Sequence, residues 1–245
     1  VGLAYAEELC FAPRFVRARE ILASGRLGDP LYVTQREAHA GPYSPWFFRR
    51  EEAGGGVLMD MACHSIECVR WLLGKPAVRS VAARLGRTLH AGRTELEDHS
   101  VVQLEFEGGP TATLEASWAL QGGMQSKLEV WGTKGYLEAD LLHAGGLRVF
   151  AEESVEGESA GWQVAHADVL AEGGYPQELA HFLRAFREGR VPQESGEDGL
   201  AVLEVLYAAY ASAAAGSSVA LPLRPEGVRY AVDLWLERSA AGSPR

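Results

Sequence analysis

Cysteine, basic charge and long apolar runs are all scarce in this sequence. Its three cysteines are an odd number at spacings that suggest no disulfide framework, so we expect a protein of the reducing cytoplasm. The formal net charge is -10 and no basic run occurs, so we expect neither nucleic acid nor a membrane surface as a partner. No apolar stretch reaches the roughly 20 residues of a transmembrane helix.

Two kinds of ligand-binding motif are also absent. The glycine fingerprint G-x-G-x-x-G, which binds the pyrophosphate of a dinucleotide, does not occur. Neither His-x-x-x-His nor Cys-x-x-Cys occurs, so we expect no metal site. With 245 residues, 47% of them hydrophobic, the chain is long enough for one large or two modest globular domains.

The best candidate for chemistry follows three consecutive glycines at positions 54–56. A helix is expected from near Val57 to Gly74, because neither Gly nor Pro occurs between them. Asp60 and His64 are four residues apart and Glu67 follows three later, so one helical face carries an acid, an imidazole and a second acid. Such a face could serve a catalytic cleft. The alternatives are a simple side-chain hydrogen bond, a solvated face, or a zinc site that would need a third ligand.

The remaining pattern predicts an α+β protein. Alternating apolar residues indicate strands from 31 to 39 and then a series of hairpins between 76 and 166, with a short strand at 219–221. Successive hairpins imply a large, mainly antiparallel open sheet with helices on one face. Helices are expected over 13–25, 175–189 and 196–215, and from Pro225 past Trp235. The apolar residues of the second of these helices should point inward: Leu179, Phe182, Leu183 and Phe186.

The segment 40–53 lies directly before the three glycines and is expected to be irregular. It is rich in proline, aromatic residues and arginine, including Trp46 and Arg50. We interpret it as a wall of a ligand pocket. The alternative is a loop packed on the core with its arginines in water.

Several short motifs resemble those of one enzyme family when taken in order and spacing. They are Phe11-x-Pro13, Gly25-Arg26-Leu27-Gly28, the three glycines with Asp60 and His64, Glu97-Asp98, Ser117-Trp118, Tyr175-x-x-Glu178-x-x-x-Phe182 and Val219-x-Leu221-Pro222. Together they resemble the C-terminal part of the Gfo/Idh/MocA oxidoreductases, the family of glucose-fructose oxidoreductase and inositol dehydrogenase. Members typically oxidise a sugar or polyol, or reduce the matching ketone, with NAD or NADP bound on an N-terminal Rossmann domain.

The resemblance implies a role for individual residues. His64 matches the proton-transfer histidine and Asp60 its acidic neighbour, while Trp46, Arg50, Tyr175 and Glu67 are implied substrate contacts. Members usually have Asp where this chain has Glu67. The family's Glu-Lys-Pro motif is absent, so we expect that residues 1–12 are a remnant of the nucleotide-binding domain. Residues 13–245 would then form a substrate-binding and oligomerisation domain that is inactive when isolated.

Three functional hypotheses remain open at this stage. The first is the catalytic part of an NAD(P)-dependent dehydrogenase that acts on a sugar or polyol. The second is an NAD-dependent glycosidase of the same family. The third is a non-catalytic binding or oligomerisation domain, since the open sheet face has to be covered and a second copy of the chain could cover it.

Overall fold

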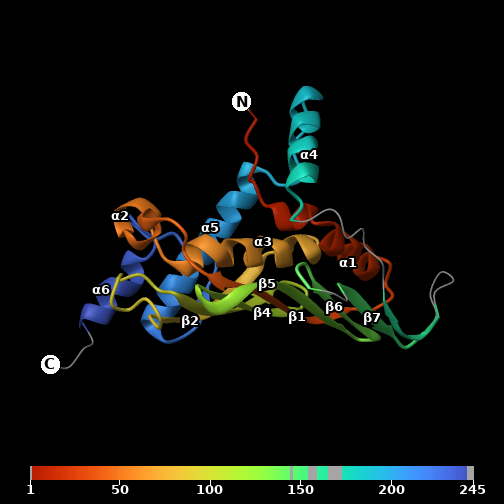
Figure 1. The fold of residues 1–245 in the computed structure, drawn as a ribbon, viewed down its shortest axis with the longest axis horizontal. Helices are drawn as coiled ribbons and strands as arrows, with labels where there is room; N and C mark the ends of the chain where they lie inside the picture. Colours follow the sequence, from red (N-terminus) through yellow and green to blue (C-terminus); the bar gives the residue numbers. More distant parts are fainter. Residues whose placement is uncertain (1, 144–145, 154–158, 165–172, 242–245) are drawn as a thin grey trace. The chain divides into compact units, whose positions relative to one another are not determined.

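The computed structural model describes residues 2–143, 146–153, 159–164 and 173–241 (Figure 1). The chain forms two compact units, each built from three stretches of sequence. The first unit comprises Val1–Gln35, Glu67–Pro76 and Gln125–Ala201, and the second comprises Arg36–Ile66, Ala77–Met124 and Val202–Arg245. Segments distant in the sequence therefore build each unit.

The described strands form one nine-stranded sheet in the order β8-β7-β6-β5-β1-β4-β3-β2-β9. Every pair whose register the structure describes is antiparallel, which confirms the expected open, mainly antiparallel sheet. The strands are β1 Pro30–Ala40, β2 Val78–Gly86, β3 His99–Phe106, β4 Thr111–Ser117, β5 Ala119–Gly132, β6 Gly135–Asp140, β7 Leu147–Ala151, β8 Gly161–Val164 and β9 Val219–Ala220. Ala165, expected to end a strand, lies outside the described residues.

In the first unit, helix α1 (Pro13–Ala23) covers one face of the strands, over β6 (Figure 1). Pro13 occupies the first helical position, where its missing N–H costs no hydrogen bond. The helix buries Phe15, Ala18 and Ile21, which recur at helical spacing. Below it, Val130 and Leu137 pair across the β5–β6 hairpin and are fully buried, as alternation predicts.

Helix α4 (Tyr175–Arg187) forms where expected, but the expectation about its inward face is wrong for three of the four residues. Phe182 is buried and packs edge-on against Phe11, with ring centroids 5.7 Å apart. Leu179, Leu183 and Phe186 are 59%, 58% and 44% exposed. Spacing alone could not show this, because an apolar stripe identifies a face for burial without identifying what covers it.

In the second unit, β2, β3 and β4 form an antiparallel meander. One face buries alternate apolar side chains, such as Val102, Leu104 and Leu114, and the short helix η3 (Leu58–Ala62) packs on it. The opposite face is polar and carries the exposed ion pair between Arg36 and Glu115. Helices on one face are therefore confirmed here.

The other helices are η1 Glu8–Phe11, η2 Pro45–Phe48, α2 Arg50–Ala53, α3 Cys63–Leu72, α5 Gly196–Ala215 and α6 Asp233–Ala241. Two boundaries differ from expectation. Segment 40–53 contains two short helices, η2 and α2, and the last helix begins at Asp233 rather than at Pro225. Gly227 has a φ of 72°, a left-handed conformation that interrupts any helix starting at Pro225.

Helix α5 is long and apolar enough to cross a membrane, judged by length and composition only. The sequence pattern had not singled it out as such a candidate. Core helices pass the same test, and α5 has buried side chains that belong to the core, including Val205 and Tyr210. The hydroxyl of the buried Ser212 accepts the N–H of Ala83, which ties this end of α5 to β2.

Candidate functional site

The candidate site lies in the second unit at the start of the helix predicted from the glycine run. We call η3 and α3 together the site helix. Its first turn is a π-helix rather than the expected α-helix, and Asp60 lies within that turn. π-turns are rare and are frequently found at functional sites.

Asp60 is held by a side chain from the sheet. The indole Nε1–H of Trp118 donates a hydrogen bond of 2.8 Å to its Oδ2. Burial raises the pKa of Asp60, while the hydrogen bond from Trp118 and the nearby imidazoles of His39 and His64 oppose that rise. The carboxylate is thus partly desolvated but kept in one orientation by a fully buried ring.

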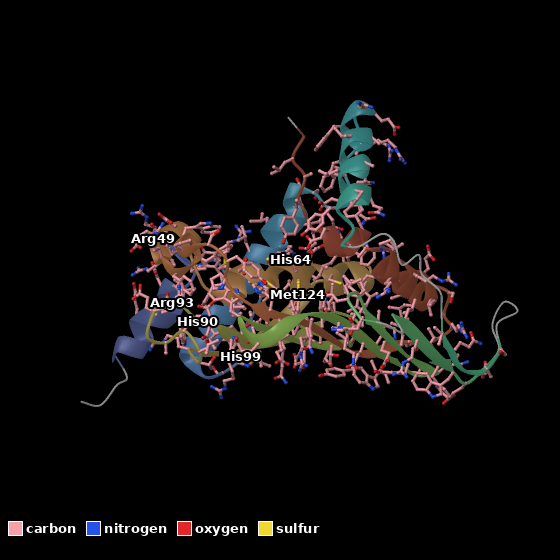
Figure 2. The ribbon with its side chains drawn as sticks, viewed as in Figure 1. Arg49, His64, His90, Arg93, His99 and Met124 are labelled. Atoms are coloured by element: carbon pink, nitrogen blue, oxygen red, sulfur yellow. The ribbon has the colours of Figure 1, made fainter. Side chains whose placement is uncertain are left out.

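His64 lies in the first turn of α3, where Figure 2 labels it. Its side chain is half-buried, and it is close enough to Asp60 for its charge to favour the carboxylate. The predicted association of these two groups is therefore present in the structure. A part-exposed imidazole beside a fixed carboxylate can accept and return a proton.

A second imidazole, His39 of β1, also lies near Asp60. It is buried and stacks on Tyr43, with ring centroids 5.0 Å apart and planes inclined by 12°. Gly41 allows this arrangement, because a Cβ there would lie 2.1 Å from the His39 ring. Sequence reasoning missed His39, since nothing in its spacing relates it to a helix that begins only at Leu58.

Trp46 belongs to an aromatic group that reaches Asp60 through Trp118. It stacks on Phe47 with centroids 3.7 Å apart, and Phe47 meets the Trp118 ring edge-on at 6.2 Å. Trp46 is 43% exposed, so one end of this group faces solvent. The aromatic residues of this segment thus pack together, and both the pocket wall and the role of Trp46 in binding substrate stay predictions.

Arg50 has a different environment from the one expected for a substrate contact. Its Nε lies 2.6 Å from Oδ1 of Asp233, and its guanidinium lies over the ring of Tyr230 at 5.7 Å. These contacts join α2 to the first turn of α6, which Figure 1 places at the same end of the second unit. The structure therefore gives Arg50 a structural partner, and its substrate contact remains untested.

Glu67 lies in the first unit and is completely buried. Its carboxylate pairs with Arg70 and lies 3.4 Å from the Lys75 ammonium. The pKa of Glu67 is raised to about 9, chiefly because burial disfavours its charged form; the neighbouring Glu194 adds to this rise, while the charges of Arg70 and Lys75 oppose it. A group so enclosed is placed to stabilise the core, which does not favour the substrate contact that we expected.

Lys75 organises this buried cluster and bears on the question of a metal. Carboxylate oxygens of Glu67, Glu194 and Asp198 lie within 4.8 Å of one another, a spacing that could suit a cation. The Lys75 ammonium, however, lies 3.0 Å from Glu194 and 2.8 Å from Asp198 and supplies positive charge there. Lys75 also has a φ of 62°, and such a strained conformation persists where surrounding contacts fix it.

Tyr175 opens α4 in the first unit and is 57% exposed. Its hydroxyl donates a hydrogen bond of 3.2 Å to Glu8. The exposed ring is available for a ligand, and its expected contact with substrate or nicotinamide stays a prediction.

The described residues do not fit a dinucleotide. Pyrophosphate sites of this type use a glycine-rich turn between a parallel strand and a helix, whereas every strand pair with a described register is antiparallel.

The chain thus has an α+β fold in which an open, mainly antiparallel sheet carries a helix with Asp60 and His64. Residues 15–138, just over half of the chain, match the GFO/IDH/MocA C-terminal domain. The chain belongs to this family.

Two relatives and one further solved structure show how far the similarity extends. Myo-inositol 2-dehydrogenase of Thermotoga maritima is 28% identical over 216 residues, which cover 86% of this chain and 62% of that protein. GenD2 of gentamicin A biosynthesis, solved with NAD, is 34% identical with a TM-score of 0.78 and covers 91% of this chain and 64% of its own. The aldose-aldose oxidoreductase of Caulobacter crescentus, solved with glycerol, is 26% identical with a TM-score of 0.76. The match covers 90% of this chain and 64% of that protein. The chain thus spans about 60% of the length of the curated relatives it matches.

Proposed function

We propose that this chain is the substrate-binding and catalytic part of an NAD(P)-dependent oxidoreductase that acts on a sugar or polyol. The observation that carries the proposal is the arrangement of His64 beside an Asp60 whose carboxylate is fixed by Trp118. Membership of the family supports it, as do the names of its relatives, which include an inositol dehydrogenase and a 1,5-anhydro-D-fructose reductase.

The roles of the residues follow from the chemistry of alcohol oxidation. A bound nicotinamide would take hydride from the carbinol carbon, so the hydroxyl proton needs a base. His64 is proposed as that base, because imidazole has an ordinary pKa near 6.5 and is suited to proton transfer at neutral pH. The carboxyl group of Asp60, held by Trp118, would favour the imidazolium that forms. The solvent-facing ring of Trp46 would receive the C–H face of the sugar.

The cofactor is proposed to be held mainly by a nucleotide-binding domain that works with residues 13–245. Support comes from the exposed apolar face of α4, formed by Leu179, Leu183 and Phe186, which suits a second domain. The solved relative with bound NAD supports NAD(P) as the cofactor class. On this proposal the isolated chain binds no nicotinamide and is inactive. Free thiols at all three cysteines fit a cytoplasmic protein.

The second copy of the chain is proposed to bind the open face of the first unit. Four aromatic residues there are cross-strand partners on adjacent strands: Trp131 of β5, Tyr136 of β6, Phe150 of β7 and Trp162 of β8. The ring centroids of Trp131 and Tyr136 are 5.1 Å apart, those of Tyr136 and Trp162 5.9 Å, and those of Phe150 and Trp162 5.7 Å. Trp162 is 58% exposed. We call these four residues the aromatic ladder. An aromatic face of this kind is typical of protein interfaces, so we infer a homo-oligomer.

A panel of polyols and sugars tests the activity. The complete enzyme, including its nucleotide-binding domain, is incubated with each compound and with NAD or NADP while the nicotinamide absorbance is followed. Reduction of cofactor by at least one polyol or sugar is expected, and the chain alone should give none. Release of the leaving group from an aryl glycoside without net cofactor reduction would indicate glycoside cleavage instead and would overturn the proposal. Absence of both reactions would favour a non-catalytic domain.

A further inference from the structure

The three glycines before the site helix meet two buried side chains that no part of the proposed chemistry uses. Glu97 lies two residues before the start of β3, and Tyr210 lies on α5. Both side chains are fully buried. The Tyr210 hydroxyl donates a hydrogen bond of 2.6 Å to Oε1 of Glu97. All of these residues belong to the second unit.

Glu97 binds three consecutive backbone N–H groups at the start of the site helix. Its Oε1 accepts the N–H of Gly56 at 2.9 Å and that of Leu58 at 3.1 Å. Its main-chain carbonyl accepts the N–H of Val57 at 2.9 Å. The first N–H groups of a helix have no partner within it, and here one residue satisfies three of them.

Two of the glycines are required by the closeness of this contact. A Cβ on Gly55 would lie 2.1 Å from the Tyr210 hydroxyl oxygen, and a Cβ on Gly56 would lie 2.0 Å from the Glu97 carbonyl oxygen. Only Gly54 has a left-handed φ, of 73°. Gly54 therefore turns the chain, and Gly55 and Gly56 let Tyr210 and Glu97 approach the backbone closely. The three glycines are held in place by these contacts.

The contact of Glu97 with the backbone fixes the position of the first turn of the site helix, and with it the positions of Asp60 and His64. The carbonyl of Gly56 accepts the N–H of Asp60 at 3.1 Å, so the residue gripped by Glu97 is hydrogen-bonded to the residue that Trp118 orients. Burial raises the pKa of Glu97 to about 7 against the hydrogen bonds from Tyr210 and the backbone, and its Oε2 has no hydrogen-bond partner among the described residues. Such a group is costly to bury, and its one engaged oxygen serves the site helix.

We propose that Glu97 and Tyr210 are positioning residues that clamp the first turn of the site helix and so set the geometry of Asp60 and His64. The inference rests on the proposed function for its effect on catalysis. The clamp itself is a structural claim about three amide groups and can be measured separately. Displacement of a catalytic group by about 1 Å costs on the order of 10²-fold in rate, so a loosened clamp should lower kcat.

Three conservative substitutions test the clamp in the complete enzyme. Tyr210→Phe keeps the ring and removes the donor, and Glu97→Gln keeps an acceptor oxygen for the same N–H groups. Ser212→Ala is the matched control: it removes a buried hydroxyl two residues from Tyr210 on α5 that bonds to Ala83 of β2, away from the site helix. We expect Tyr210→Phe to lower kcat about tenfold or more with a smaller change in KM. Glu97→Gln should retain most of the activity, and Ser212→Ala should retain kcat while lowering the thermal midpoint.

Amide hydrogen exchange provides the readout that does not depend on activity. In Tyr210→Phe, exchange at Gly56, Val57 and Leu58 should rise by about tenfold or more relative to the wild type. In Ser212→Ala it should rise near Ala83 instead. If the wild-type enzyme is inactive while these three amides are protected from exchange, the proposed function is refuted but the clamp is supported. Unchanged exchange and an unchanged kcat in Tyr210→Phe, with a thermal midpoint lowered as in Ser212→Ala, would overturn the clamp.

Discussion

The indole N–H of Trp118 lies 2.8 Å from the Asp60 carboxylate, and the two residues are 58 positions apart in the chain. Trp118 sits between β4 and β5 with its ring fully buried, while Asp60 lies in the π-turn that opens the site helix. The sheet thus orients an acid that the helix carries. This relationship makes the protonation of Asp60 sensitive to a residue in the core.

Replacing Trp118 by phenylalanine should shift the pH dependence of the reaction. The hydrogen bond favours the charged form of Asp60, so its loss raises the pKa of that carboxyl. A higher pKa means that the carboxylate is lost at a higher pH, so the acidic limb of the kcat/KM profile should move upward. At neutral pH, kcat/KM of Trp118→Phe should be about tenfold to a hundredfold lower than that of the wild type, which corresponds to the free energy of a hydrogen bond to a charged group. Trp235→Phe makes the same chemical change on α6, outside both the site and the aromatic ladder, and superimposable profiles for Trp118→Phe and wild type would refute the effect.

Replacing His64 by alanine tests the proposed base directly. We expect kcat of the complete enzyme to fall by at least about two powers of ten, because a positioned general base contributes 10²–10⁴-fold. The binding of substrate should change less, because the imidazole acts in the proton-transfer step. His143, which is exposed and pairs with Asp140 in the first unit, provides the control His143→Ala with an unchanged kcat. Steady-state kinetics that give His64→Ala a wild-type kcat remove His64 from the mechanism.

Glu67 should make the protein less stable as the pH rises. Its pKa is raised from 4.5 to about 9 in the folded protein, so the folded state keeps a proton that the unfolded state has lost between these values. The free energy of unfolding should therefore fall with pH in this window, by at most about 1.4 kcal/mol per pH unit for one proton. Glu67→Gln mimics the protonated side chain and should flatten this dependence.

Denaturant unfolding at several pH values between 5 and 9, a range chosen from the linkage above, measures the effect. The variant should match the wild type at the acidic end and exceed it at the basic end. Glu188→Gln changes an exposed carboxylate paired with Arg190 and should leave the dependence unaltered. Parallel curves for wild type and Glu67→Gln would show that Glu67 stays ionised in its cluster.

The aromatic ladder predicts the association state. Trp162→Glu places a charge on the exposed ring position of β8, where burial against a second chain would cost several kcal/mol. Light scattering of the complete protein should give an oligomer for the wild type and a smaller species for the variant. Leu89→Glu, at a position that is 55% exposed in the second unit, should leave the mass unchanged. A monomeric wild type, or a variant of the same mass, would be incompatible with assembly through this face.

Much of the fold could be predicted from local pattern. The helices α1 and α5 begin and end close to their expected positions, and the hairpins β3–β4 and β5–β6 lie within the expected segment, because alternation and helical spacing identify a buried face without reference to partners. The insertion of β1 between β4 and β5 was not predicted, since it depends on a strand distant in the sequence. The same reasoning failed at α4, whose apolar stripe is largely exposed, and at α6, which begins eight residues late at Asp233 instead of Pro225. In both cases the outcome depends on contacts and on backbone conformations that spacing does not encode.

The sequence by itself determined that Asp60 and His64 share one helix behind a run of glycines, since a spacing of four residues fixes that relationship. Only the tertiary structure decided what surrounds them. It brought Trp118, His39, Glu97 and Tyr210 to the start of that helix, and it enclosed Glu67 with Lys75 in a buried cluster. The reason is physical: hydrogen bonds and charges act between neighbours in space, and an antiparallel sheet makes neighbours of residues that lie far apart in the chain.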